Sequence, residues 1–437
     1  MKKLVVAILG AGVLLAGGLY LTRRRPAELP VDEGAQQVFR AEAAESGLLI
    51  HYDDPRTPLR ALRWLPPVQE GTFVAQVNTQ GDRQQISIFR DSAFLDSYLV
   101  PKPQGVRDGF FRMAELRQAL VADGDAAVLL YMVPGSGELP LALALDLRTR
   151  TVRWTHRAIG ERLAMTEGAV YLYGPRTSPV RLPLALAAGE TNSPAGARSS
   201  ARIVELPPEI QEVAELLPTG SWSFLVAHKG GLSAYLGSKG WLHQPVPEGD
   251  PGLFKNVGPA LCGGGGKFWW QPFPGRVIQV QADGTPRGAW TPAELPTAPP
   301  FARDASLLHL LGAAPDGRLW FDLSVPAEPP RPESSPEAEP RPGEPEGSAA
   351  PQEPEGWAAY AGRGLGRIYC WDPQKRVLRG TAWSALKVPP GMPRPEKGVK
   401  GSPGAGALLL ENGSSAWLLP LAAIPAGEPT ATLKPGS

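Results

Sequence analysis

The chain has 437 residues, of which 43% are hydrophobic and 20% are charged, enough for a large core and unlike the composition of a disordered protein. Its 44 basic and 43 acidic residues leave a net charge of +1, which argues against a nucleic acid or an acidic membrane surface as partner. The two cysteines, Cys262 and Cys370, are too few for a disulfide framework or a four-cysteine zinc site.

The first 25 residues have the pattern of a membrane-targeting segment. Two lysines precede an uncharged run of 19 residues, Leu4 to Thr22, and three arginines follow it. As a helix this run would span about 28 Å, close to the ~30 Å hydrocarbon core of a bilayer. We expect a signal anchor over residues 1–25 in the inner membrane, with a cleaved signal peptide as the alternative. The rest of the chain would then be periplasmic, or secreted after cleavage.

Short apolar runs separated by tight turns dominate the chain after a polar tether predicted over residues 26–46. The 50 glycines and 49 prolines indicate many turns, and runs broken by Gly, Asp and Asn are typical of β-hairpins. Seven such hairpins recur along the chain. They begin near Phe73, Ala127, Arg162, Phe224, Ala260, Leu307 and Ala407.

A second element, a strand, an aspartate turn and a strand that carries tryptophan, follows several hairpins. The aspartate would cap the turn, and the tryptophan would pack between neighbouring sheets. The pairs are Asp54 with Trp64, Asp146 with Trp154, Asp283 with Trp290, and Asp372 with Trp383.

A hairpin and an outer pair together make a four-stranded blade, so the sequence predicts an all-β fold, a single β-propeller of about seven blades. The N-terminal outer pair has no hairpin before it, and the C-terminal hairpin has no outer pair after it. We therefore predict that the two ends share one blade and close the ring. The propeller would cover residues 47–325 and 356–425, followed by a flexible tail over 426–437.

The segment Ala144-Leu-Asp-Leu-Arg-Thr149-Arg150-Thr-Val-Arg-Trp154 resembles the tryptophan-docking repeat of quinoprotein-like propellers, A-x-D-x-x-T-G-x-x-x-W. It differs from that pattern at Arg150, where the family usually has glycine. The family includes pyrroloquinoline quinone dehydrogenases and non-catalytic scaffolds that bind proteins in the bacterial envelope. The adjacent, disulfide-bonded cysteines that some of the dehydrogenases use have no counterpart here. The resemblance therefore favours a scaffold without a cofactor.

No motif in the sequence assigns a catalytic residue. Five histidines (His51, His156, His228, His243 and His309) occur singly and without the spacing of a metal site, so no metal is expected. His228 is the first of them to test and is a candidate for the contact surface. Neighbours in a strand face opposite sides, so one of Trp269 and Trp270 should lie between blades. The other either packs between blades as well or faces the channel or solvent, where it is a candidate contact residue for a sugar or a protein.

Residues 326–355 contain ten prolines and eight glutamates but only two arginines, a composition typical of a disordered insertion. The sequence as a whole favours a membrane-anchored, non-catalytic propeller that binds a protein partner. The alternative is an enzyme, quinoprotein or lyase-like, whose site residues converge at the central channel. The sequence leaves the oligomeric state open.

Overall fold

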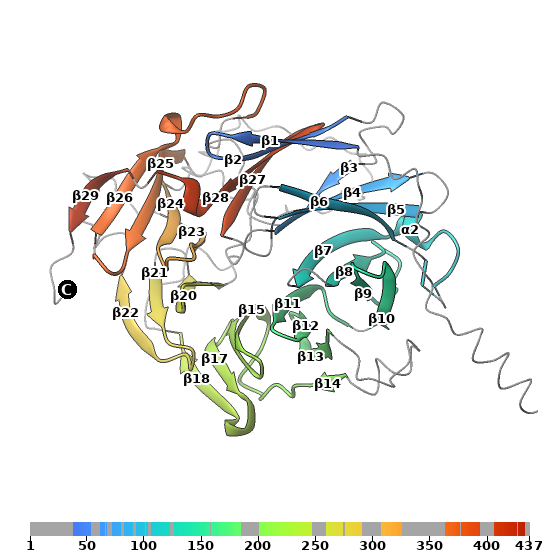
Figure 1. Ribbon diagram of the computed structural model, residues 1–437. Helices are drawn as coiled ribbons and strands as arrows, with labels where there is room; N and C mark the ends of the chain where they lie inside the picture. The colour runs from blue at the N-terminus through green and yellow to red at the C-terminus, as the bar shows by residue number, and fades with distance from the viewer. Residues whose placement is uncertain are drawn as a thin grey trace, which may run out of the picture.

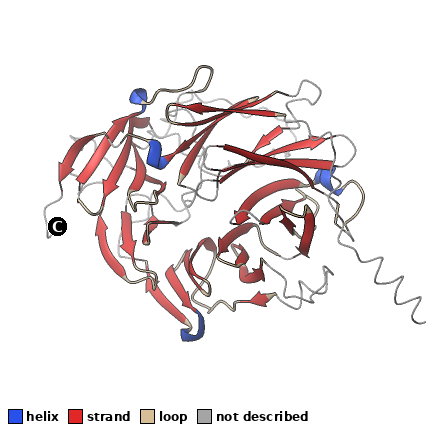
Figure 2. Ribbon diagram, viewed as in Figure 1, coloured by secondary structure: helices blue, strands red, loops and turns tan. Residues whose placement is uncertain are grey.

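The computed structural model describes residues 38–53, 62–65, 67, 72–79, 83–90, 93–100, 102–103, 106–122, 126–157, 159–184, 201–246, 259–273, 276–290, 307–325, 363–375, 377–393, 406–425 and 427–432. Almost all of their regular structure is antiparallel β-sheet (Figure 2). Among these residues no helix is long and apolar enough to cross a membrane. The predicted N-terminal span lies outside them.

Seven sheets surround a common centre, as Figure 1 shows, so the predicted all-β propeller of seven four-stranded blades is confirmed. Blade 1 contains β3 (Leu62–Trp64), β4 (Thr72–Thr79), β5 (Arg83–Arg90) and β6 (Ala93–Val100). The short helix α2 (Phe110–Met113) leads into blade 2, with β7 (Glu115–Ala122), β8 (Ala126–Met132), β9 (Leu141–Asp146) and β10 (Thr151–Arg157). Blade 3 contains β11 (Arg162–Thr166), β12 (Ala169–Gly174), β13 (Thr177–Pro183) and β14 (Arg202–Ile203).

Blades 4 and 5 follow the same order. Blade 4 contains β15 (Val213–Gly220), β16 (Ser223–His228), β17 (Gly231–Leu236) and β18 (Trp241–Pro245), with the 3-10 turn η2 (Gly237–Lys239) before β18. Blade 5 contains β19 (Ala260–Gly264), β20 (Lys267–Phe273), β21 (Arg276–Val280) and β22 (Pro286–Trp290).

Blade 6 has a fifth strand. It contains β23 (Leu307–Ala313), β24 (Leu319–Val325), β25 (Arg363–Asp372) and β26 (Val377–Ala382), and the 3-10 turn η6 (Trp383–Ala385) follows. The additional strand, β29 (Glu428–Thr432), pairs antiparallel with β26. The prediction of a flexible tail over 426–437 is therefore wrong for this stretch, because the outer edge of β26 offers it main-chain hydrogen bonds.

The seventh sheet, the shared sheet, is built from strands near both ends of the chain. Its order is β1-β2-β28-β27, with β1 (Phe39–Ala44), β2 (Gly47–Tyr52), β27 (Ala407–Asn412) and β28 (Ser415–Pro420), after which the turn η9 (Leu421–Ala423) follows. Strand β2 pairs antiparallel with β28. Gly47 makes this approach possible, because its φ is 111° and a Cβ there would lie 2.2 Å from the Leu418 carbonyl oxygen.

The N-terminal pair differs from its prediction in three ways. It begins at Phe39, inside the predicted tether 26–46, and its turn lies before Gly47 rather than at Asp54, which is outside the described residues. Trp64 lies in β3 of blade 1 and not in the shared sheet. The reason is that Phe39 is a core residue, only 2% exposed, so burial extends the sheet further towards the N-terminus than the polar composition suggested.

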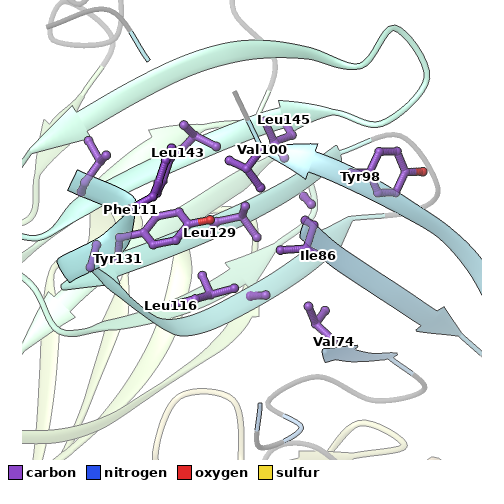
Figure 3. Packing of buried hydrophobic residues seen from close by; sticks show 14 of the residues in the cluster. Val74, Ile86, Tyr98, Val100, Phe111, Leu116, Leu129, Tyr131, Leu143 and Leu145 are labelled. Atoms are coloured by element: carbon purple, nitrogen blue, oxygen red, sulfur yellow. The ribbon is translucent and has the colours of Figure 1, made fainter. Parts of the chain in front are cut away.

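Each neighbouring pair of blades encloses its own hydrophobic cluster. Figure 3 shows the one between blades 1 and 2, where Val74 and Ile86 face Leu116 and Leu129. The shared sheet packs in the same way against blade 1 on one side and blade 6 on the other. Both faces of every blade are therefore buried, and stability depends on contacts between sheets.

Candidate functional site

The first strands of blades 2 to 6 contact one another around the centre of the ring (Figure 1). A titratable cluster lies on two of them. Arg162 of β11 donates to Glu215 of β15 across the blade boundary, with Nη1 2.9 Å from Oε2. The Tyr173 hydroxyl donates to the other carboxylate oxygen over 3.3 Å. Burial raises the pKa of Glu215 above its ordinary value, although Arg162 acts in the opposite direction.

This cluster can be interpreted in two ways. A carboxyl group with a raised pKa beside a tyrosine and an arginine is the kind of group that active sites use as an acid or base. The same contacts also join blade 3 to blade 4. No sequence motif could have found the cluster, since Glu215 lies 53 residues from Arg162 and 42 from Tyr173.

Further polar contacts join the first strands of blades 1 to 3. Arg63 pairs with Glu115 over 3.0 Å, and Glu115 lies 3.7 Å from the Nε of Arg117. The side chain of Gln118 accepts a hydrogen bond from the main-chain N–H of Leu163. These contacts link blade 1 to blade 2 and blade 2 to blade 3.

His228, the histidine chosen for testing, is buried in β16 and not on a surface. Its Nε2 lies 3.0 Å from the Ser233 hydroxyl, which lies 3.0 Å from Nδ1 of His243. The main-chain N–H of Gly230 donates to Nδ1 of His228, so in the neutral ring Nε2 carries the proton. Burial, together with the nearby His243, lowers the pKa of His228 to about 4. The interpretation of His228 as a contact residue is wrong, because the blade encloses it.

We expect the stability of the protein to fall between pH 6.5 and 4 because of His228. In this range the unfolded chain, with an ordinary pKa of about 6.5, binds a proton that the folded state excludes. The free energy of unfolding should therefore decrease by up to about 3 kcal/mol as the pH falls. Urea titrations at several pH values measure this slope, which His228→Asn should reduce. An equal slope in both proteins would contradict the assignment.

Trp269 and Trp270, the candidate contact residues, are each 1% exposed. Trp269 packs against blade 6 and Trp270 against blade 4. They do face opposite sides of the strand, but both sides are blade interfaces. Neither residue is available to a partner, so this part of the predicted contact surface is wrong.

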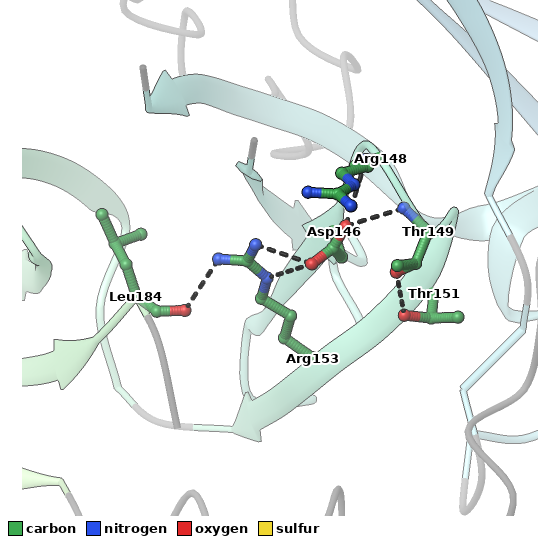
Figure 4. Close-up of polar contacts among 6 residues, drawn as sticks. All are labelled: Asp146, Arg148, Thr149, Thr151, Arg153 and Leu184. Carbon is green, nitrogen blue, oxygen red and sulfur yellow. Dashed lines mark hydrogen bonds and ion pairs between the residues drawn. The ribbon is translucent and has the colours of Figure 1, made fainter. Parts of the chain in front are cut away.

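The aspartate turns have similar geometry in three blades. Asp146 accepts hydrogen bonds from the main-chain N–H groups of Arg148 and Thr149, and Arg153 donates to its other oxygen (Figure 4). Burial favours the neutral acid, but these bonds hold the pKa of Asp146 below its ordinary value. In the other two turns, Asp283 accepts a hydrogen bond from the main-chain N–H of Thr285, and Asp372 accepts hydrogen bonds from the main-chain N–H groups of Gln374 and Lys375.

The tryptophans of the four predicted pairs have different environments. Trp154 is buried between blades 2 and 3, and its Nε1 donates to the Pro183 carbonyl of blade 3 over 2.9 Å. Trp64 donates to the Gly413 carbonyl in the turn between β27 and β28. Trp383 begins the turn η6 instead of ending a strand. The side chains of Trp290 and Trp383 lie outside the described residues.

Arg150 occupies the position where the repeat usually has glycine, and its φ of 56° explains that preference. Its guanidinium donates to Asp96 of blade 1 over 2.7 Å and lies 5.3 Å from the Tyr98 ring centroid. The left-handed backbone therefore directs the arginine to the neighbouring blade.

We expect Arg150→Gly to change the free energy of unfolding by less than about 1 kcal/mol. Glycine relieves the strain of the left-handed backbone, which stabilises the fold by roughly 1–2 kcal/mol. The variant also loses a half-exposed ion pair and makes the unfolded chain more flexible, and both effects destabilise the fold. Arg150→Ala keeps the strain and loses the pair, so it should be less stable than Arg150→Gly. Thermal unfolding of both variants measures this order, and the reverse order would contradict the strain argument.

The two cysteines are free and buried, on opposite sides of blade 6. Cys262 lies in β19 and Cys370 in β25, so they cannot supply the adjacent cysteine pair that some quinoprotein dehydrogenases place against their cofactor. Burial raises the pKa of both thiols. Within the described part of the chain, no group of three or more His, Cys, Asp or Glu side chains is arranged to hold a metal ion.

One exposed feature was not predicted from the sequence. Trp222, in the turn between β15 and β16, is 41% exposed. The guanidinium of Arg181 lies 3.8 Å from its ring centroid, and that of Arg202 lies 5.6 Å away. We call these three residues the Trp222 surface. The arginines belong to blade 3 and the tryptophan to blade 4, so no local motif identifies them.

No protein-family model and no curated protein matches the chain. Among solved structures, it is similar to a chain in the crystal structure of the mitotic checkpoint complex, with 10% identity, a TM-score of 0.44, and coverage of 87% of this chain and 96% of that one. It is also similar to the WD40 domain of SCAP from fission yeast, with 8% identity, a TM-score of 0.39, and coverage of 91% of this chain and 98% of that one. A third similar structure is the dihydro-heme d1 dehydrogenase NirN, with 11% identity, a TM-score of 0.39, and coverage of 88% of this chain and 70% of that one. Similarities at this level carry no argument about function.

Proposed function

We propose that this protein is a membrane-anchored, non-catalytic β-propeller that binds a protein partner in the bacterial envelope. The observation that carries the proposal is the Trp222 surface, because tryptophan and arginine are the residues that most often dominate the energy of protein interfaces. The apolar run Leu4–Thr22 supports the anchor, and the Lys-Lys start supports a periplasmic propeller.

We also infer that the shared sheet closes the ring and that the chain is related to quinoprotein-like propellers. The turn of Asp146 and the contact of Trp154 with blade 3 support that relationship, since both fit the structural roles expected of the repeat. The backbone of Arg150 supports it as well, because its φ suits the glycine of the pattern. These features concern blade structure, and none of them implies a cofactor.

The test is chemical crosslinking of the full-length protein in its membrane, followed by purification and mass spectrometry. The proposal expects one protein to be recovered repeatedly, at a level well above that in a strain that lacks the propeller. Recovery of no partner, together with thermal stabilisation of the protein by a quinone cofactor and Ca²⁺, would contradict it.

The Arg162–Glu215–Tyr173 cluster favours a second candidate, an enzyme with a site at the centre of the ring, quinoprotein or lyase-like. The specific observation is the raised pKa of Glu215 next to two groups that can bind or protonate a substrate. Glu215→Gln keeps the shape of the side chain but removes its acid. Under the scaffold proposal this variant keeps the partner; under the enzyme alternative it loses an activity.

A further inference from the structure

Arg181 and Arg202 lie directly opposite each other on the paired strands β13 and β14. Like charges in this position repel and destabilise a sheet. Both guanidinium groups instead contact the ring of Trp222, which attracts cations through its π face. Two positive charges are thereby gathered around one exposed aromatic ring.

Neither arginine has a carboxylate partner among the described residues, unlike three other arginines close to a blade boundary. Arg150, Arg153 and Arg162 each pair with an acid within 2.9 Å. For Arg181 and Arg202 no carboxylate of the described chain lies within ion-pair distance. Their repulsion is therefore not neutralised by any acid of the described residues.

The tryptophan is held in position before anything binds. The Tyr171 hydroxyl donates to the main-chain carbonyl of Ser221, next to Trp222, over 3.5 Å. On the other side Gly237 packs close to the turn, and a Cβ there would lie 3.4 Å from the Trp222 carbonyl oxygen. A surface that is already ordered loses less entropy when a ligand binds.

From this geometry we propose that the Trp222 surface binds an acidic segment of the partner protein, with carboxylates on Arg181 and Arg202 and an apolar side chain on the Trp222 ring. The inference rests on the proposed function and names the chemistry of its partner. Guanidinium groups match carboxylates in a paired, planar geometry. The exposed part of Trp222 favours a peptide over a small anion, since it adds apolar contact area beside the charges.

The probe is a fluorescein-labelled heptapeptide, Glu-Glu-Glu-Leu-Glu-Glu-Glu, and binding to the full-length protein is measured by fluorescence anisotropy. Arg202→Gln should weaken binding about tenfold or more, since each charge-assisted hydrogen bond contributes at least that factor, and Arg181→Gln with Arg202→Gln should abolish it. Arg176→Gln is the matched control. Arg176 is 85% exposed on the same blade and lies 3.9 Å from Glu212, so this variant should bind within about twofold of the unchanged protein.

A binding role and a structural role of Arg202 also predict different effects of its substitution on stability. Because Arg181 and Arg202 repel each other, Arg202→Gln should unfold at the same temperature as the unchanged protein or a higher one. The peptide should raise the unfolding temperature of the unchanged protein only. A clear loss of stability in Arg202→Gln would assign Arg202 to the fold instead.

Four results would overturn the proposal. They are absence of binding at about 1 mM peptide, equal binding of the matched glutamine peptide, equal weakening by Arg176→Gln, and equal occupancy by citrate, which would indicate a site for small anions. The crosslinking test is independent of these. A partner that is still recovered with the double variant leaves the scaffold function standing and contradicts only this surface.

Discussion

A chain that ends at residue 404 is expected to lose the folded state altogether. The deletion removes β27 and β28, half of the shared sheet, and leaves β1 and β2 as an isolated pair, which is marginally stable at best. It also uncovers the faces of blades 1 and 6 that the sheet buries, including Trp320, which is 0% exposed. Circular dichroism during heating should show no cooperative transition.

Deletion of residues 426–437 alone is the matched control. It removes β29, a fifth strand at an outer edge, and leaves the four strands of the shared sheet in place. This shorter chain should keep a cooperative transition, at a temperature lowered by no more than a few degrees. If the chain ending at 404 were folded and equally stable, the inference that the shared sheet closes the ring would be wrong.

The hairpins could be predicted because their signals are local. Each combines two apolar runs with turn residues, as at Glu167-Gly168 between β11 and β12. The strand that precedes the hairpin in blades 2 and 4 was missed for the opposite reason, whereas the one in blade 1 was predicted as the strand of Trp64 but assigned to the shared sheet. Strands β7 and β15 carry Glu115, Arg117 and Glu215 near the centre of the ring, and these charges interrupt the apolar pattern. The hairpins of these blades are therefore their middle strands and not their innermost pair.

The sites show the same division between local and distant signals. The turn of Asp146 is formed by residues within seven positions of one another, so its role was readable. The Trp222 surface and the Glu215 cluster each join two blades, and the residues that meet across the blade boundary are separated by at least 20 positions in the sequence. Such groups depend on how sheets stack around the ring, which no spacing in the sequence encodes.

Trp269 and Trp270 show how a correct rule led to a wrong site. Alternation along a strand does place the two rings on opposite faces. In an open sheet one face meets solvent, but blade 5 has a neighbouring blade on both sides. The exposed aromatic of this region is instead Trp222, which lies in a turn, where strand alternation makes no prediction.

Trp269→Ala and Trp270→Ala should each lower the free energy of unfolding by about 3–5 kcal/mol, because each removes a fully buried indole and leaves a cavity between two blades. Trp222→Ala, the same change at an exposed ring, should cost less than about 1 kcal/mol. Urea unfolding of the three variants measures the contrast. A small loss for Trp270→Ala would mean that its ring is not packed against blade 4 and would restore it as a contact residue. Combined with binding of the acidic peptide, the three variants separate the two roles of tryptophan here, since only Trp222→Ala should lose the peptide while the protein stays folded.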